Sequence, residues 1–341
     1  MSTTKQAAAK FAQTERPAKP AKSSRLLSPP YNALDMSPAV TDRPPARWAL
    51  ILAFALVYFC WGTTYLALKI GVQQEQWPPC LFGGVRVCIA GLLILACQVC
   101  RGQSIALVAG DRWIVVVCAL LLFVGGNGLI NVASQTLDSG VSAVLAATTP
   151  LWIAFFAMFW PHGDRLTPRG WLGLFIGLGG VLLVWMPRLQ SPDGFTANVG
   201  VFAVLGSACS WAIGSLVGRH YRVRCSHLTA AGYQTLLGGG CLALVGFALG
   251  EQHDLPDHIT AKTMAAFFWL LIFGSLIGFI AYNWLLAHVS VTQVGTYAYV
   301  NPAIAVVLGI ADGEPATVWL FGGIVVVLVG VALVRGGLRK C

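Results

Sequence analysis

Polar side chains that could hold a small molecule fall inside a segment that otherwise has the composition of a membrane span. The stretch TYAYVNPAIAVVLG, residues 296–309, places Tyr297 and Asn301 four residues apart, directly before Pro302. Side chains four apart share one face of a helix, and a phenol and an amide both donate and accept hydrogen bonds. The pattern therefore predicts a hydrogen-bonding patch for a substrate near the middle of the span.

Two prolines are expected to break helices within the membrane. Pro302 lacks an amide hydrogen, so the carbonyl of Ala298 loses its helical partner, and Pro150 does the same to Ala146. An unsatisfied carbonyl is costly in hydrocarbon, so each break must face a neighbouring helix or a wet cavity. The alternative is that Asn301 and the tyrosines only join helices and that the proline only kinks a packing helix.

Other polar and aromatic side chains in apolar segments are candidates for the same substrate-binding set. They are Trp61 and Tyr65, four apart; Asn127 and Asn131, four apart; and the neighbours Tyr282 and Asn283. For each of them, helix packing or an interfacial aromatic position is the alternative. We predict that the set as a whole, together with Tyr297 and Asn301, faces the substrate.

One cation, Arg86, is expected to be buried. It lies about seven residues from the outer end of its apolar segment, roughly 10 Å deep at the helical rise of 1.5 Å per residue. A buried cation needs a partner, so Arg86 is a candidate for attracting a substrate carboxylate. Helix-end carbonyls or Gln234 are the structural alternative. Lys69, at the outer end of its own segment, is expected to extend to the interface instead.

Residue sets for catalysis or metal binding are missing from the sequence. It has no HExxH motif, no paired intramembrane carboxylates and no Walker A loop, which argues against an intramembrane enzyme or an ATPase. CQVC, residues 97–100, has metal-ligand spacing, but no second CxxC or spaced histidine pair completes a four-ligand set. A charged ring or filter repeat, which would favour a channel, is not visible. We predict no metal, no cofactor and no enzymatic activity.

The composition is that of a membrane protein. Of 341 residues, 57% are hydrophobic and 10% are charged, with a mean hydropathy of +0.72; charged residues make up about a quarter of a soluble domain. Strand-like alternation is absent, so the predicted fold class is an all-α polytopic bundle rather than a barrel. Ten apolar blocks are long enough to span a bilayer as helices: roughly 48–70, 80–100, 113–132, 141–160, 170–186, 199–217, 228–249, 264–287, 291–311 and 318–334.

The segment before the first block, residues 1–47, is rich in Lys, Ala, Pro and Ser and has no apolar run. It is expected to be a disordered cytoplasmic tail rather than a secretory signal, because it cannot bury enough surface to fold and the first apolar block is long enough to stay in the bilayer. With the amino terminus inside, all but four of the 22 Lys and Arg residues fall on the inner side. This asymmetry fits the positive-inside rule with both termini cytoplasmic.

The two halves of the chain repeat one another with a shift of 148 to 152 residues. Trp61 falls on Trp211, Pro150 on Pro302, and GVLLV (180–184) on GVALV (330–334). We predict two repeats of five helices, residues 48–187 and 198–335. Because five is odd, the second repeat must enter the membrane from the opposite side. Inverted repeats are typical of secondary transporters, whose binding site lies near the midplane between the repeats.

Several motifs also resemble a known family. WGTTYLALKIGV, WPPCLFGGVRVCIAG, GNG with a later SG, TYAYVNPAIAVVLG and GE are similar to the EamA branch of the drug/metabolite transporter superfamily, and most to its YedA-type members. The similarity covers residues 48–335. It implies ten helices with both termini inside, and export of small metabolites, often amino acids or amphipathic compounds, across the cytoplasmic membrane of a bacterium. Partners are then a small-molecule substrate and the bilayer, not nucleic acid, and the chain is expected to be a monomer or dimer.

Energy coupling is predicted from where the acidic residues fall. All thirteen Asp and Glu residues are placed in the tail or in loops, so no span has the embedded carboxylate that proton relays use. His288 could change charge near neutral pH, but its place at an interface favours a solvated role. We therefore expect a facilitative exporter, with a proton-coupled antiporter as the alternative and a channel or an intramembrane enzyme as lesser ones.

Overall fold

The computed structural model describes residues 45–160, 165–189, 194–221, 223–289 and 291–339. The described residues all belong to one compact unit, residues 45–341, which is the second of two along the chain. The expected disordered tail, residues 1–47, falls almost wholly outside the described residues. Everything below concerns the second unit.

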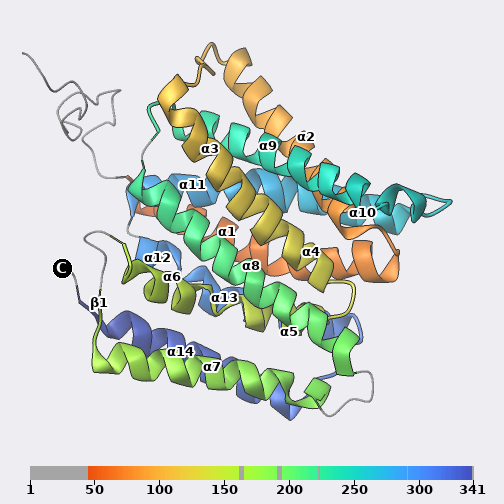
Figure 1. The fold of residues 1–341 in the computed structure, drawn as a ribbon, viewed down its shortest axis with the longest axis vertical. Helices are drawn as coiled ribbons and strands as arrows, with labels where there is room; N and C mark the ends of the chain where they lie inside the picture. The colour runs from red at the N-terminus through yellow and green to blue at the C-terminus, as the bar shows by residue number, and fades with distance from the viewer. Residues whose placement is uncertain (1–44, 161–164, 190–193, 222, 290, 340–341) are drawn as a thin grey trace, which may run out of the picture. The chain divides into compact units, whose positions relative to one another are not determined.

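The second unit is almost entirely helical (Figure 1). Three of its segments are π-helical: η1 (Lys69–Gln74), η3 (Leu120–Gly128) and η5 (Leu270–Gly278). Two short 3₁₀ turns are η2 (Ala109–Asp111) and η4 (Glu251–His253), and two short strands, β1 (Arg165–Leu166) and β2 (Leu338–Arg339), pair antiparallel. The α-helices are α1 (Arg47–Leu68), α2 (Pro79–Cys100), α3 (Arg112–Ala119), α4 (Leu129–Ala133), α5 (Ser139–Ala146), α6 (Thr149–Ala157), α7 (Pro168–Leu189), α8 (Gly194–His220), α9 (His227–Ala248), α10 (Ala261–Trp269), α11 (Phe279–His288), α12 (Val291–Val294), α13 (Tyr297–Ala311) and α14 (Val318–Gly336).

Nine helical stretches of the described residues are long and apolar enough to cross a membrane. They correspond to nine of the ten expected blocks. The remaining block, 291–311, is divided into α12 and the shorter α13, so ten long spans are not what the described residues show. Many large apolar side chains are exposed, among them Phe175, Leu244 and Val307 at 66% to 68%. Exposed apolar area on this scale is suited to lipid, and the protein is a polytopic membrane protein.

Two closely packed helix pairs flank the bundle. α2 packs along α9, and α7 packs along α14; Figure 1 shows the pairs at opposite edges of the view. Glycine permits both contacts: a Cβ at Gly84 would lie 2.4 Å from the Ala243 nitrogen, and one at Gly330 would lie 2.4 Å from the Gly177 nitrogen. Small residues at helix interfaces let membrane helices approach this closely.

A methyl group at Gly330 is therefore expected to destabilise the protein. Gly330→Ala puts its Cβ against the backbone of α7, which cannot rotate away. We therefore expect the free energy of unfolding to fall by about 1 to 3 kcal/mol. Gly322→Ala on the same helix is the matched control, because nothing lies within 4 Å of its added Cβ. Thermal unfolding of both variants in detergent measures the difference. Equal unfolding temperatures would show that the α7–α14 contact is not tight.

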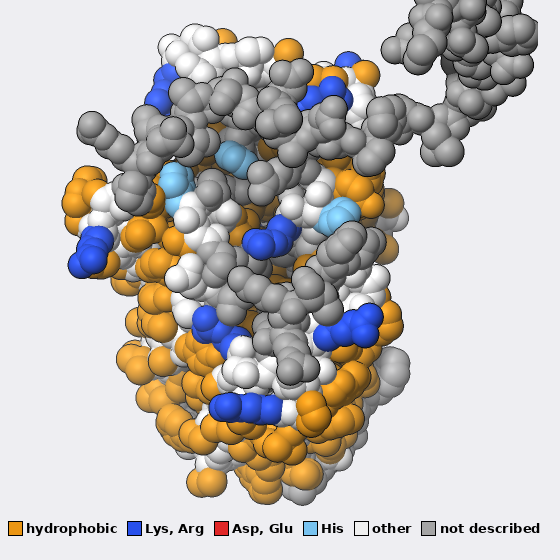
Figure 2. Space-filling model, turned by 90° about the vertical axis from the view of Figure 1, so that its left-hand side faces the viewer, with side chains coloured by type: hydrophobic (Ala, Val, Ile, Leu, Met, Phe, Trp, Pro, Cys, Tyr) orange, Lys and Arg blue, Asp and Glu red, His pale blue; other side chains and the backbone are white. Residues whose placement is uncertain are grey.

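Cationic side chains gather at one end of the bundle (Figure 2). The face at the end that carries β1 shows several cationic side chains, and no acidic side chain of the described residues is visible on it (Figure 2). The arginines at the helix ends and loops on this side are Arg101, Arg112, Arg165, Arg169, Arg219 and Arg224. At the other end Lys69 lies among acids: 3.0 Å from Glu314, 3.7 Å from Asp138 and 3.8 Å from Asp312. The acidic cluster at this end therefore holds the Lys69 ammonium.

Three carboxylates, Glu251, Glu314 and Asp111, are buried although they lie in a loop or in a short turn at the end of a span. Glu251 accepts hydrogen bonds from the amides of Cys80 (3.1 Å) and Leu81 (2.7 Å) at the start of α2. Glu314 does the same for the first two amides of α5. Asp111, in the first turn of its span, accepts from the Arg224 amide at 2.8 Å and pairs with its guanidinium at 3.1 Å. Glu251 and Glu314 are stabilised in buried positions because the first amides of a helix have no partner within it and favour negative charge, whereas Asp111 is held by Arg224.

Candidate functional site

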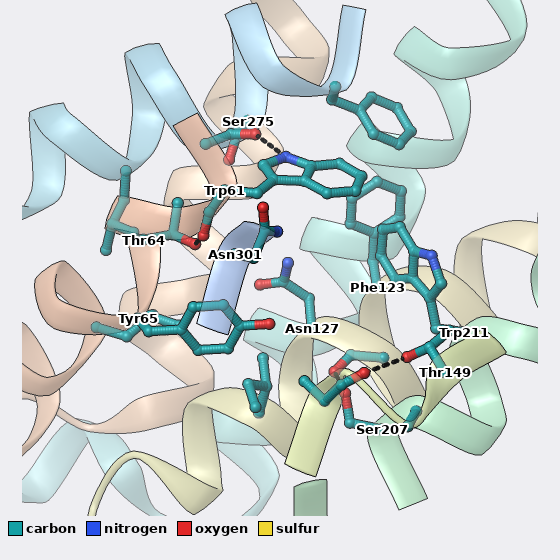
Figure 3. Close-up of a pocket in the computed structure, with 18 of the residues that line it drawn as sticks. Trp61, Thr64, Tyr65, Phe123, Asn127, Thr149, Ser207, Trp211, Ser275 and Asn301 are labelled. Carbon is teal, nitrogen blue, oxygen red and sulfur yellow. Dashed lines mark hydrogen bonds between the residues drawn. The ribbon is translucent and has the colours of Figure 1, made fainter. Parts of the chain in front are cut away.

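A cavity of about 130 Å³ lies between α1, η3, α8, η5 and α13. One water occupies roughly 10 to 15 Å³ on the same measure, so the space suits on the order of ten waters or one small metabolite. Figure 3 shows that side chains from these elements converge on it. It is lined by Trp61, Thr64, Tyr65, Leu68, Arg86, Phe123, Gly126, Asn127, Ile130, Ala146, Thr149, Ser207, Ala208, Trp211, Leu270, Gly274, Ser275, Phe279, Tyr297 and Asn301.

Two of the three π-helical segments, η3 and η5, line this cavity. η3 contributes Gly126 and Asn127, and η5 contributes Gly274 and Ser275. The segments Leu120–Gly128 and Leu270–Gly278 have equal length and lie 150 residues apart, which is within the repeat shift. π-helical turns are rare and are found mostly at functional sites, because they re-aim side chains. Nothing in the periodicity of the sequence indicated them.

Arg86 enters the cavity wall from α2 and is only 3% exposed. Its Nη2 donates to Asn127 Oδ1 at 2.9 Å, and its Nη1 donates to Ser275 Oγ at 3.1 Å and to the Leu270 carbonyl at 3.4 Å. Its Nε has no acceptor. Two structural partners were expected as alternatives for Arg86. A backbone carbonyl, that of Leu270, does bind it, whereas Gln234 is not among its hydrogen-bond partners described above and does not line the cavity.

An aromatic cluster forms one side of the cavity. The Trp61 ring lies 5.7 Å from the ring of Trp211 and 5.2 Å from that of Tyr297, both nearly edge-on. Its indole nitrogen donates to the Gly274 carbonyl at 3.3 Å, which fixes α1 to η5. Such edge-to-face contacts are favourable and hold ring orientation. Tyr65 lies one turn further along α1, and its hydroxyl points toward the cavity near Asn127 (Figure 3).

Asn301 and Tyr297 both line the cavity from α13. With its amide oriented to satisfy its neighbours, the Asn301 nitrogen donates to the carbonyl oxygens of Tyr297 and Tyr58, each 3.2 Å away. The bond to Tyr58 joins α13 to α1. Asn301 therefore contributes to packing and lines the cavity at once, so the two interpretations left open by the sequence do not exclude each other.

The two prolines differ in their effect on the chain. α5 ends at Ala146 and α6 begins at Thr149, so the interruption lies just before Pro150. The Ala146 carbonyl, which Pro150 leaves without a helical partner, accepts from Thr149 Oγ1 at 2.7 Å. Both residues line the cavity.

Pro302 does not break a helix, contrary to expectation. It lies inside α13, and the chain is interrupted upstream, between α12 and α13. Proline removes one amide donor, so the Ala298 carbonyl lacks its usual partner four residues on, while the helix continues on both sides of Pro302. The two prolines thus do not mark equivalent breaks.

Three candidates lie outside the cavity wall. Asn131 is fully buried and donates to the Pro79 carbonyl at 3.3 Å, so it supports the start of α2. Asn283 donates to the carbonyl of Phe279 on its own helix at 2.9 Å. Tyr282 packs behind Trp61, with ring centroids 4.8 Å apart. Six candidates, Trp61, Tyr65, Arg86, Asn127, Tyr297 and Asn301, are brought together.

Several lining residues were not among the candidates. Trp211 coincides with Trp61 in the repeat register, and that match could have added it to the set. Ser207 donates to the Gly126 carbonyl at 2.6 Å and Thr64 to the Trp61 carbonyl at 2.7 Å. No sequence pattern separates these hydroxyls from packing residues.

The chemistry that the cavity offers is recognition. Its described lining has hydroxyls, amides, aromatic faces and one guanidinium, but no Asp, Glu, His or Cys. Across the described ranges, no group of three or more such residues could hold a metal ion. This arrangement can bind and orient a small molecule.

Comparisons with known proteins agree with this architecture. The sequence matches the EamA-like transporter family over residues 47–186 and again over 198–336. It is 34% identical over 278 residues to the uncharacterized inner membrane transporter YedA of Escherichia coli strain K12, covering 80% of this chain and 86% of that one. It is 26% identical to the uncharacterized transporter YvbV of Bacillus subtilis strain 168, covering 86% of this chain and 92% of the relative.

A solved crystal structure has the same fold, with a TM-score of 0.60 at 22% sequence identity; the match covers 84% of this chain and 96% of that one. Two family matches that together span most of the chain, and a relative above 30% identity, agree with the resemblance of the sequence motifs. The chain belongs to the EamA-like transporter family.

Proposed function

We propose that the protein is a secondary transporter that exports a small metabolite by alternating access, with the central cavity as its binding site. The observation that carries this proposal is that side chains of both family-matching segments, 47–186 and 198–336, line one cavity. A site between two halves can open to either side as one half rocks against the other.

The two segments are proposed to be inverted repeats, residues 48–187 and 198–335, that cross the membrane ten times. The equal π-helical segments η3 and η5, 150 residues apart, support this repeat. The packed pairs α2–α9 and α7–α14 also fit, since each joins elements at corresponding positions of the two halves. The basic end shown in Figure 2 is proposed to face the cytoplasm, with both termini on that side of a bacterial inner membrane.

Transport is proposed to be facilitative, running down the gradient of the substrate. No carboxylate lines the described cavity, and the three buried acids already cap helices or pair with a cation. A proton-coupled antiport site at this cavity would need a group that titrates there. Proton coupling is the alternative that the experiment decides.

Purified protein in lipid vesicles tests both parts of the proposal. Efflux of labelled L-phenylalanine, phenylpyruvate, phenethylamine and uridine is measured separately, with and without unlabelled compound outside. A carrier shows saturation and counter-transport, whereas flux that rises linearly with concentration indicates a channel. Uphill accumulation driven by an imposed pH gradient, and abolished by a protonophore, would contradict facilitative transport.

Removing single polar groups from α13 is expected to reduce transport more than protein abundance. Asn301→Ala and Tyr297→Phe each remove a group at the cavity, and the loss of one hydrogen bond worth about 1 kcal/mol predicts a fivefold to tenfold lower transport rate. Asn283→Ala is the control, because its side chain bonds only within α11. Transport is normalised to folded protein measured by size-exclusion chromatography. If the transport rate and the amount of folded protein fall in parallel, these side chains serve packing alone.

A further inference from the structure

Arg86 brings a positive charge to the cavity that the described residues do not neutralise. Its three acceptors are an amide, a hydroxyl and a backbone carbonyl, all uncharged. No carboxylate of the described chain lies within 4.0 Å of its guanidinium, and none lines the cavity. A buried cation is costly unless it is paired. The cavity beside it is the space from which a partner can come.

The guanidinium also has donors to spare. It carries five N–H groups, and three of them have acceptors in the structure. Nε–H is unpartnered, and Nη2 has one hydrogen beyond the one that Asn127 takes. Two N–H groups are the number that a carboxylate uses when both of its oxygens bind an arginine. Asn127 and Ser275 meanwhile hold the guanidinium from two sides.

The rest of the cavity is suited to a flat apolar body. Aromatic rings from five different elements line it: Trp61 and Tyr65 on α1, Phe123 on η3, Trp211 on α8, Phe279 on α11 and Tyr297 on α13. Rings bury large apolar area with little conformational freedom to lose. A substrate ammonium, in contrast, would find no carboxylate among the described lining residues and would be repelled by Arg86.

We propose that the cavity selects an organic monoanion, a carboxylate on an aromatic or similarly flat apolar body, and that Arg86 binds its carboxylate. This inference rests on the proposed function and names the substrate class of the same site. A single positive charge matches one negative charge, so a cation and a zwitterion are bound less well.

Export of a monoanion by such a carrier moves one negative charge out of the cell in each cycle. A membrane potential that is negative inside favours this movement by about 50-fold in concentration ratio per 100 mV. The potential then supplies the driving force, and no proton-binding carboxylate is needed in the cavity. The three buried acids described above lie outside the cavity lining and are bound to helix-start amides or to a cation, which is consistent with this.

Three compounds that share one phenyl ring and differ in charge test the selection. Binding of phenylpyruvate, L-phenylalanine and phenethylamine to the purified full chain in lipid nanodiscs is measured by tryptophan fluorescence, since Trp61 and Trp211 line the cavity. Phenylpyruvate is expected to bind at least tenfold more tightly than phenethylamine, with L-phenylalanine between them. Equal binding of all three, tighter binding of the cation, or binding of none would overturn the inference. This binding series uses only the wild-type protein, so it does not depend on whether a variant folds.

Variants at Arg86 test the residue. Arg86→Gln is expected to reduce phenylpyruvate affinity at least 30-fold and to remove the charge preference, while Arg86→Lys keeps part of both. Arg219→Gln, which removes an exposed cation at the end of α8, is the control and is expected to change neither. A folded Arg86→Gln protein with wild-type affinity for phenylpyruvate would show that Arg86 is structural. If the glutamine variant does not fold, the lysine variant and the charge series still decide.

Transport in vesicles under a potassium diffusion potential separates this inference from the proposed function. Phenylpyruvate efflux is expected to accelerate when the vesicle interior is negative and to slow when the sign is reversed. Binding through Arg86 without any flux would refute transport but keep the anion site. Saturable flux of phenethylamine or uridine without binding of phenylpyruvate would keep transport and refute the anion site.

Discussion

Replacing Ala208 by phenylalanine is expected to stop transport while the protein stays folded. Ala208 on α8 lines the cavity, whose volume is about 130 Å³, and a phenyl ring there occupies much of the space that the substrate needs. Filling an existing void costs less than overpacking a closed core, so stability should change little. We expect at least a tenfold loss of vesicle flux at an unchanged unfolding temperature.

A phenylalanine introduced elsewhere on α8 provides the control. Val199 is 43% exposed on the apolar surface, so Val199→Phe adds a ring of the same kind outside the cavity and should leave flux unchanged. If Ala208→Phe is folded and transports at the wild-type rate, substrate does not pass through this cavity. If it unfolds at a lower temperature than Val199→Phe, the cavity has less room than its volume indicates.

The fold was predictable to the extent that hydropathy determines it. Lipid imposes a simple constraint: each span must satisfy its backbone internally, so apolar blocks of the right length become helices. Local variation in the backbone was not predictable in this way. The π-helical η3 and η5 and the division between α12 and α13 depend on packing against other segments, and the sequence reports such packing only weakly.

The candidate site, too, was predictable only in part. Arg86 and Asn301 were identified because a cation or amide is unusual in a span, and both line the cavity. Asn131 is equally unusual and faces the start of α2 instead. Composition alone cannot tell these positions apart, because a polar side chain in a membrane helix is needed both where a substrate binds and where a neighbouring helix starts.

Loss of the Glu314 carboxylate is expected to have the largest effect on stability. Glu314 is 7% exposed and accepts from the amides of Ser139 (2.7 Å) and Gly140 (3.0 Å) and from Lys69 (3.0 Å). It thus connects the start of α5 to the end of α1. Glu314→Ala leaves the two buried amides without this acceptor and takes from Lys69 its nearest carboxylate, which predicts a loss of about 3 kcal/mol or more in the free energy of unfolding. Thermal unfolding in detergent measures it.

The stability difference between wild type and Glu314→Gln is expected to depend on pH, because Glu314 titrates and glutamine does not. Burial would raise the pKa of Glu314, but hydrogen bonds from Ser139, Gly140 and Lys69 outweigh it and hold that pKa below its usual range. A lowered native pKa means that the charged form stabilises the fold above the unfolded pKa, about 4.3. The stability difference between wild type and Glu314→Gln should therefore be full at pH 7 and decline as the pH falls from about 4.3 through the lower native pKa.

The exposed Asp254, at the same end of the bundle, supplies the control for this pH series. Asp254→Asn removes one carboxylate without removing a buried partner, so it should lower stability little at any pH. Lys69→Met should destabilise less than Glu314→Ala, because Glu314 keeps its two amide donors when the lysine is gone. A Glu314→Gln protein as stable as wild type at pH 7 would mean that the carboxylate gains no more from these donors than a neutral amide does.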